Sequence, residues 1–271
     1  MVFITYQLKL FCIALQFLTR IPVTGRLAAW VGYSDEMLRA SSRYFALVGA
    51  LVGLFGAAVY ACAAQLWPLN SQHSGLIAAV LCFSATAWLT GGFHEDGLTD
   101  YVDGMGGGQT PEHVLAIMKD SRVGSYGVLA ILMLTLLKVF GVSGLTLWQA
   151  VCAIVLAHTA GRACACGVMF SLSYVRGEDS SKNKPLAQAM HRFELVVVFS
   201  TLALVSALVL LCAPDLVWHV VLAWVLASLS TLALASHMRR RIGGFTGDAL
   251  GAVEQCAEVA VLLAFAVQFT A

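Results

Sequence analysis

Seven apolar stretches, each roughly 20 residues long, restrict the folds that this sequence can adopt. They cover residues 44–66, 75–92, 124–146, 148–170, 194–213, 216–236 and 249–270. A helix of about 20 residues crosses a hydrocarbon layer roughly 30 Å thick. The chain is 59% apolar and 11% charged, whereas a soluble domain has about 25% charged residues. The sequence therefore predicts an all-α polytopic membrane bundle with about seven transmembrane helices.

No feature of the chain divides it into parts. There is no low-complexity tract and no clear internal repeat, so residues 1–271 are expected to form one integral-membrane domain. The net charge of +1 gives no indication of nucleic acid as a partner. The eight cysteines mostly fall in apolar runs and form no C-x-x-C pair, which is typical of small apolar side chains. The sequence leaves open whether the protein is a homo-oligomer.

The basic residues predict how the spans are oriented. Of the 16 Lys and Arg residues, 14 lie in four segments, 1–43, 93–123, 171–193 and 237–248. The alternate loops contain none. Since Lys and Arg concentrate in cytoplasmic loops, these segments are expected to face the cytoplasm. Residues 3–22 are apolar but interrupted by Lys9, without a convincing cleavage site, which favours an interfacial helix on the cytoplasmic side over a signal peptide.

The motif GGFHEDGLTDYVDGMGGG, residues 91–108, gathers four carboxylates at the cytoplasmic end of the second span: Glu95, Asp96, Asp100 and Asp103. If the helix continues through the motif, Asp100 lies roughly 40° and Asp103 roughly 20° from Asp96 around the helix axis, while Glu95 points about 100° away. Like charges on one helical face repel. A hard divalent cation such as Mg²⁺ would offset that repulsion, and a solvated acidic loop is the alternative.

Cations and glycines follow in two further motifs. IMKDSRVGSYG, residues 117–127, supplies Lys119 and Arg122 together with Asp120. Cations beside a metal site suit a polyphosphate substrate, and the alternative is a positive-inside anchor for the third span. RRRIGGFTGDALGA, residues 239–252, places glycines before a helix that carries Asp248 in its first turn. Such a loop favours anions, and Asp248 is expected to be a ligand, a base or only an N-cap.

Charged residues also fall within the predicted spans. Glu254 and Glu258 lie in the last span, and since a carboxylate in mid-membrane costs about 2.5–3.5 kcal/mol, they should face a polar cavity. Arg162 is expected either to face the same cavity or to extend toward the membrane surface. Lys138 is expected to extend toward the outer surface. His94, next to the acidic cluster, is a candidate for substrate binding or proton transfer, with a structural role as the alternative.

Together these features suggest Mg²⁺-dependent phosphoryl transfer at the cytoplasmic face. The motifs GGFHEDGLTDYVDG, IMKDSRVGSYGVLA and GGFTGDALGAVEQCAE, with IALQFLTRIPV at residues 13–23, resemble those of the cobalamin synthase family, the adenosylcobinamide-GDP ribazoletransferases. The resemblance extends over essentially the whole chain. Residues 170–215 contain no motif that matches.

The resemblance implies a multi-pass inner-membrane enzyme that uses Mg²⁺ and has its active site on the cytoplasmic side. It would join adenosylcobinamide-GDP to α-ribazole or its 5′-phosphate with release of GMP, forming adenosylcobalamin or its phosphate. Asp96, Asp100 and Asp103 would bind the metal, and Asp248, Glu95 and His94 would be catalytic. The implied substrate-binding residues are Lys119, Asp120, Arg122, Arg162, Gly244, Thr246, Gly247 and Glu258.

Two alternatives remain at this point. A CDP-alcohol-type phospholipid phosphotransferase fits poorly, because the residues that follow Asp96 and Gly97 do not supply the Ala and Arg of its D-G-x-x-A-R pattern. A cation transporter could line its path with Asp96, Asp100, Glu254 and Glu258. Transporters, however, usually place their site near the midplane between repeated halves, and here the charge gathers at one face.

Overall fold

The computed structural model describes residues 2–66, 74–175 and 190–269, and these are almost entirely helical. A single isolated bridge between Tyr174 and Phe245 is the only β-type pairing in those ranges. The longer helices are α1 (Val2–Leu18), α4 (Phe45–Leu66), α5 (Ser74–Thr90), α6 (Phe93–Gly107), α8 (Ser125–Ser143), α9 (Leu147–Ser171), α10 (Arg192–Cys212), α11 (Val217–Ile242) and α12 (Gly247–Ala266). The short ones are α2 (Gly25–Val31), α3 (Asp35–Ser41) and α7 (Pro111–Met118), with 3₁₀ turns Ser42–Tyr44 and Pro214–Leu216.

The predicted all-α membrane bundle is confirmed. Among the described helices, six are long and apolar enough to cross a membrane, or seven if the bent pair α5 and α6 counts as one span. Every apolar stretch identified in the sequence corresponds to one helix, with boundaries that differ by a few residues. The largest difference is in α11, which continues to Ile242 and so includes the three arginines expected in the following loop.

The helices α9 and α12 form the centre of the bundle. In each of them, 72% of the apolar 18-residue stretch that could cross the membrane is buried, compared with 28% for α8 and 22% for α10 and α11. The central helix α12 packs against α6, α8, α9 and α11, while α4 packs along α9. The outer helices therefore present large apolar side chains outward, including Leu132, Leu136, Leu204 and Leu232, as lipid contact requires.

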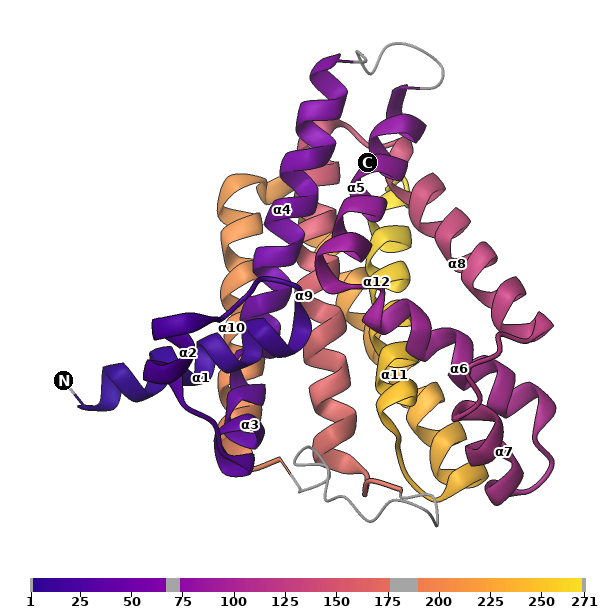
Figure 1. Cartoon of the computed structure of the whole chain (residues 1–271). Coiled ribbons are helices and arrows are strands. Elements are labelled where there is room, and N and C mark those ends of the chain that lie inside the picture. Colours follow the sequence, from indigo (N-terminus) through magenta and orange to yellow (C-terminus); the bar gives the residue numbers. More distant parts are fainter. Residues whose placement is uncertain (1, 67–73, 176–189, 270–271) are drawn as a thin grey trace.

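The N-terminal helices lie apart from the core. Figure 1 shows α1 crossing the bundle at an angle to α4 and α9, with α2 and α3 beside it. This arrangement agrees with the predicted interfacial helix, and Phe3, Ile4 and Leu8 of α1 are exposed. The segment is joined to the bundle by a buried ion pair, in which Arg43 Nη2 lies 2.8 Å from Glu194 Oε1 of α10.

The charged segments meet at one end of the molecule. Figure 1 shows α3, α6, α7 and the C-terminal end of α11 toward one end of the bundle. The C-terminal end of α12 lies toward the opposite end. Three charged segments therefore share one side in the parts that are described, as the basic residues predicted. Arg176, Lys182 and Lys184 of the fourth segment lie outside the described residues.

Candidate functional site

The acidic motif begins at a sharp bend. The helices α5 and α6 meet at 90°, and the two residues between them, Gly91 and Gly92, have φ of 78° and 70°. Only glycine adopts this left-handed region at little cost. The helix of the second span ends at Thr90, close to its predicted end at residue 92, because the paired glycines turn the chain. The motif is helical nevertheless, so the predicted relation among its acids holds on α6.

A glycine crossing brings α6 against α12. A Cβ added to Gly97 would lie 3.1 Å from the Cα atom of Asp248 and 3.3 Å from the Cα atom of Gly251. One added to Gly251 would lie 2.9 Å from the carbonyl oxygen of His94. Small residues permit such close backbone approach. The crossing places the first turn of α12, with Asp248, beside the acidic face of α6.

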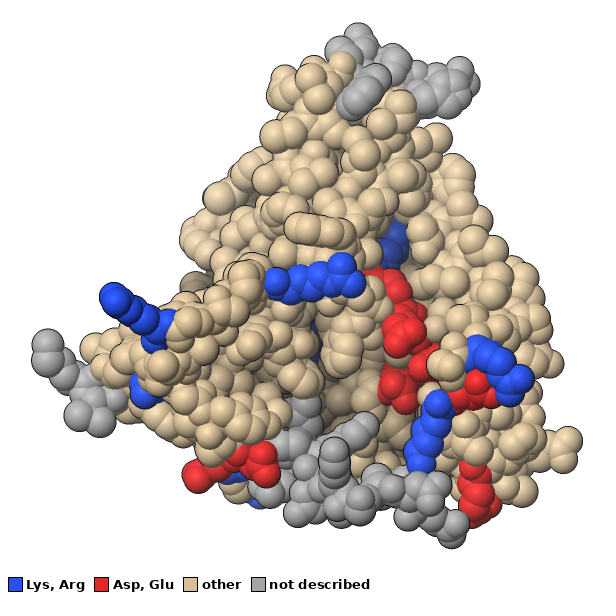
Figure 2. Space-filling view, in the orientation of Figure 1, with Lys and Arg blue, Asp and Glu red and all other residues tan. Residues whose placement is uncertain are grey.

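The carboxylates of the two helices influence one another. Burial, followed by the charges of Asp96, Asp248 and Asp103, raises the pKa of Asp100 from 3.8 to about 6. Figure 2 shows the acidic side chains gathered in one band over α6, with basic side chains at its margins. We call Asp96, Asp100 and Asp248 the carboxylate band. An all-oxygen set of this kind, under mutual repulsion, suits a hard cation.

Asp103, the third predicted metal ligand, has a different environment. It is buried, and its carboxylate accepts hydrogen bonds from the backbone N–H groups of Gly124 at 2.7 Å and Gly127 at 2.9 Å. These are free N–H groups at the start of α8, where a negative charge is favoured by the helix dipole. Asp103 thus anchors α8 to α6.

The glycine loop before α12 differs from the predicted anion cradle. Gly244 approaches the protein's own backbone, since a Cβ there would lie 2.1 Å from the carbonyl oxygen of Ser173. Phe245 also pairs with this segment, its N–H donating to Ser173 O at 2.9 Å. By contrast, Gly247 is exposed with open space around it. The close approach expected for substrate at Gly244 is therefore a structural contact with the segment that follows α9.

Thr246, rather than Asp248, is the N-cap of α12. Its hydroxyl accepts a hydrogen bond from the N–H of Ala249 at 3.1 Å, which is the usual capping contact. Asp248 occupies the first turn of the helix. The alternative that Asp248 only caps the helix is thereby removed.

The cations of the second motif are exposed. Arg122 forms a bidentate pair with Asp120, with Nη2 to Oδ2 at 2.6 Å. This pair holds the pKa of Asp120 at about 2, chiefly through the Arg122 side chain. Lys119 caps the C-terminus of α7 and is also exposed. Within the described residues, neither Lys119 nor Arg122 forms an ion pair with the acids of α6.

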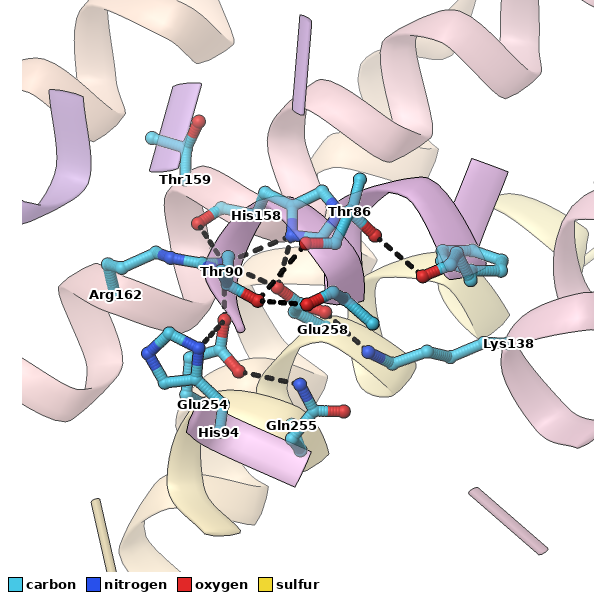
Figure 3. A network of polar contacts seen from close by, with 12 residues as sticks. Thr86, Thr90, His94, Lys138, His158, Thr159, Arg162, Glu254, Gln255 and Glu258 are labelled. Carbon is cyan, nitrogen blue, oxygen red and sulfur yellow. Dashed lines mark hydrogen bonds and ion pairs between the residues drawn. The ribbon is translucent and has the colours of Figure 1, made fainter. Parts of the chain in front are cut away.

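A buried network of polar side chains lies behind the band. Figure 3 shows Arg162 and His158 of α9, Glu254 and Glu258 of α12 and Lys138 of α8 converging on one another. Arg162 pairs with both glutamates, and its Nη1 lies 2.5 Å from Glu258 Oε1. Lys138 Nζ lies 2.5 Å from Glu258 Oε2. Two cations thus balance two carboxylates, as burial in the bundle requires.

This network corrects two sequence predictions. Lys138 does not extend toward the outer surface, because it is 5% exposed and its ammonium bonds Glu258. Arg162 faces the polar interior together with Glu254 and Glu258, and the alternative of extension toward the surface is wrong. His94 of α6 reaches the same network, with Nδ1 3.9 Å from Glu254 Oε1.

Of the described residues, the group with metal-ligand spacing is His158, Glu254 and Glu258, whose candidate atoms lie within 4.8 Å of one another. Its negative charge is already balanced by Arg162 and Lys138. A divalent cation would have to displace them. The network is therefore better explained as structural.

Sequence reasoning missed three residues near the site. His158 and Gln255 sit inside apolar spans, where a polar side chain was itself a signal. Arg20 lies over the bend, since a Cβ on Gly91 would be 2.8 Å from its Nε, and its backbone N–H donates to Leu89 O at 2.7 Å. Its place beside α6 follows from the fold of α1 and could not be read from the sequence.

Comparisons with known proteins give one consistent result. A family model described as cobalamin-5-phosphate synthase matches residues 10–266. Proteins named adenosylcobinamide-GDP ribazoletransferase are similar along almost their entire length. One from a Polaromonas species is 42% identical, covering 95% of this chain and 96% of that protein. One from Shewanella amazonensis is 45% identical, covering 95% and 94%. No solved structure gives a significant match.

Proposed function

Because the chain belongs to the cobalamin-5-phosphate synthase family, we propose that it transfers the cobinamide phosphate of adenosylcobinamide-GDP to α-ribazole or α-ribazole 5′-phosphate. GMP is released, and the product is adenosylcobalamin or its 5′-phosphate. The observation that carries this proposal is the carboxylate band, which two distant segments of the chain build at the charged end of a membrane bundle. The active site accordingly faces the cytoplasm from the inner membrane.

The residues of the band fit Mg²⁺. Asp96 is exposed, and Asp100 and Asp248 are half-buried, so these side chains are accessible. The raised pKa of Asp100 reflects its burial first and the neighbouring carboxylates second. We propose that Asp96 and Asp100 hold the ion, with Asp248 opposite them and Asp103 fixing the helix that carries them. When bound, Mg²⁺ would neutralise the diphosphate and the departing GMP phosphate.

The remaining steps belong to the protein's own side chains. A secondary ribose hydroxyl of the ribazole, which stays free when the 5′ position carries phosphate, attacks the phosphorus on the cobinamide side of the diphosphate, and GMP leaves. Asp248, the member of the band on α12, or Glu95, which adjoins the band on α6, accepts the hydroxyl proton. Arg20, Lys119 and Arg122 supply positive charge at its margins, where they can attract the diphosphate. In this proposal Arg162 and Glu258 position α12 and do not touch the substrate.

The transporter alternative loses its main support. It required Glu254 and Glu258 to line an ion path, but both are engaged by Arg162 and Lys138 in a balanced network. The CDP-alcohol alternative is not favoured either, since the family match extends over residues 10–266.

The test is GMP release by the purified protein in liposomes, supplied with adenosylcobinamide-GDP and α-ribazole. Release should require both substrates and Mg²⁺, and Asp96→Asn and Asp100→Asn should each lower turnover by about two orders of magnitude or more. Asp215→Asn, an exposed acid at the opposite end, is the matched control and should retain wild-type turnover. Mg²⁺-independent release, or a fully active Asp100→Asn variant, would refute the assignment of the band.

A further inference from the structure

The N-terminal segment carries positive charge with no acid in the same stretch of sequence. Residues 1–34 contain Lys9, Arg20 and Arg26 but no Asp or Glu. The first acids of the chain stand in the first turn of α3. Figure 2 shows basic side chains over α1 and α2 and acidic ones over α3. The surface formed by α1 and α2 is therefore suited to an anionic partner.

Two of these cations gather around one aromatic ring. Lys9 Nζ of α1 lies 5.3 Å from the centre of the Trp30 ring on α2, a distance at which a cation and an aromatic face attract each other. Arg26 precedes Trp30 by four residues on α2, which places both side chains on one face of that helix. In the part of the chain that the structure describes, neither Lys9 nor Arg26 forms an ion pair. We call Lys9, Arg26 and Trp30 the Trp30 cluster.

The helices that carry the Trp30 cluster also expose large apolar side chains. Phe3, Ile4 and Leu8 of α1 are each more than half exposed. On α2, Leu27 is 45% and Trp30 is 41% exposed. Tryptophan is enriched where a membrane meets water, and Lys and Arg at that level attract the phosphates of anionic lipids. The combination of cations, tryptophan and apolar side chains on two interfacial helices is typical of contact with lipid headgroups.

An apolar groove of about 640 Å³ lies between α1, α2 and α3. Its volume is in the range of small-ligand sites. Ile13, in its wall, follows Lys9 by one helical turn, so the Trp30 cluster lies beside one end of the groove. The buried apolar cluster of this segment has four members among the described residues and is separate from the main core. The apolar side chains that line the groove are Ile13, Phe17, Val23, Ala28, Val31 and Leu38.

We propose that the segment α1–α3 binds an anionic phospholipid of the surrounding bilayer, with the lipid phosphate at Lys9 and Arg26 and one acyl chain in the groove. The inference goes beyond the proposed function and does not depend on it. A lipid is favoured over a soluble anion, because a soluble anion would leave the groove and the exposed apolar side chains in water. Arg20 lies two residues beyond α1 and against Gly91 at the bend, so a lipid that holds α1 also holds Arg20 beside the carboxylate band.

The first test measures contact between Trp30 and lipid in the full-length protein. The other five tryptophans are replaced by phenylalanine, and the protein is reconstituted in phosphatidylcholine vesicles that contain phosphatidylglycerol as a minor component. Either one lipid or the other carries brominated acyl chains, which quench tryptophan fluorescence on contact. Per brominated molecule, phosphatidylglycerol should quench Trp30 at least about threefold more strongly than phosphatidylcholine, because the anionic lipid is held by the two cations.

The second test removes the charges of the cluster. Lys9→Gln/Arg26→Gln keeps both side chains polar, and the mole fraction of phosphatidylglycerol that gives half-maximal quenching should rise by about tenfold or more. Arg192→Gln/Arg239→Gln is the matched control, since it removes two exposed charges from the ends of α10 and α11. The control should shift that mole fraction by less than about twofold, because its charges are not at the groove.

The third test fills the groove. Ala28 lines it and Ala29, the next residue on α2, does not, so Ala28→Leu and Ala29→Leu make the same change on one helix. Mass spectrometry of protein purified in mild detergent should find phosphatidylglycerol retained by the wild type and by Ala29→Leu. The amount retained by Ala28→Leu should fall by about fivefold or more, because the added side chain occupies the place of the acyl chain.

Each contrary outcome rejects a stated part of the proposal. Equal quenching by the two brominated lipids in the wild type would mean that Trp30 meets the bilayer without an anionic site, and would overturn it. No quenching by either lipid would mean that a second copy or another protein covers the surface, and would overturn it as well. Equal lipid loss in Ala28→Leu and Ala29→Leu would refute the groove assignment. None of these measurements uses GMP release, so a failure of the proposed function leaves them unaffected.

Discussion

Replacing Arg162 by methionine should destabilise the bundle strongly at neutral pH. The guanidinium pairs with both Glu254 and Glu258, and it is the sole cation in the network that contacts Glu254. Methionine keeps the side-chain length and the packing between α9 and α12 but removes the charge. Two buried carboxylates would then face each other, and Lys138 and His158 would remain as partners of Glu258.

The structure sets the size of the effect. The candidate ligand oxygens of Glu254 and Glu258 lie within 4.8 Å, and at an effective dielectric constant of about 20 two unit charges at that distance repel by about 3.5 kcal/mol. This agrees with the roughly 3–5 kcal/mol typical of a buried pair that loses one partner. A change of this size multiplies the unfolded fraction by more than about 100.

The assay is unfolding of the purified protein in mixed micelles, followed by tryptophan fluorescence. The double variant Arg162→Met/Glu254→Gln removes one charge of each sign, and should recover at least half of the lost stability, since the repulsion disappears with the Glu254 carboxylate. Thr201→Met, on α10 and outside the network, serves as the control for a methionine in the membrane region. If Arg162→Met unfolds within about 1 kcal/mol of wild type, or the double variant is no more stable than the single one, the charge-balance argument is wrong.

Three further predictions follow from the site. Asp103→Asn should lower stability by about 1–3 kcal/mol as well as turnover, because the amide cannot accept both backbone N–H groups; thermal unfolding with unchanged stability would contradict the anchoring role. Gly251→Val should abolish turnover while leaving a folded protein, since its side chain forces α12 away from Gly97, and cross-linking of cysteines on α6 and α12 would detect the separation. Because the pKa of Asp100 is raised from 3.8 to about 6, Mg²⁺-free protein should lose thermal stability as pH rises through 6, and saturating Mg²⁺ should abolish that loss. A pH slope that Mg²⁺ leaves unaltered would argue against a metal at the band.

The apolar stretches predicted the helices well because a membrane leaves the backbone few options. Once about 20 apolar residues occur in sequence, a helix follows. Hydropathy also placed the end of the second span near Gly91 and Gly92, but it did not predict that the chain turns there by 90°. That turn depends on packing of α6 against α12, which hydropathy does not record.

The acids of the site were visible in the sequence, but their partners were not. Helical periodicity alone grouped the aspartates of α6 on one face. The pairing of Lys138 with Glu258 joins residues 120 positions apart, and no local pattern indicates it. Gly244 was misread for a related reason, because a glycine that admits a ligand and one that admits the chain's own backbone look the same in sequence.

The glycine crossing between α6 and α12 limits where residues can be inserted into α12. Asp248 at its first turn, Gly251 at the crossing and Glu254 and Glu258 deeper in the bundle all lie on α12. One residue inserted between Gly251 and Glu254 would rotate everything beyond it by about 100° and shift it by about 1.5 Å. The glutamates would then miss Arg162 even though composition and hydropathy stayed the same. The number of residues in the stretch 248–258 is therefore fixed by its contacts at both ends. Natural or engineered insertions should be confined to the connections outside it.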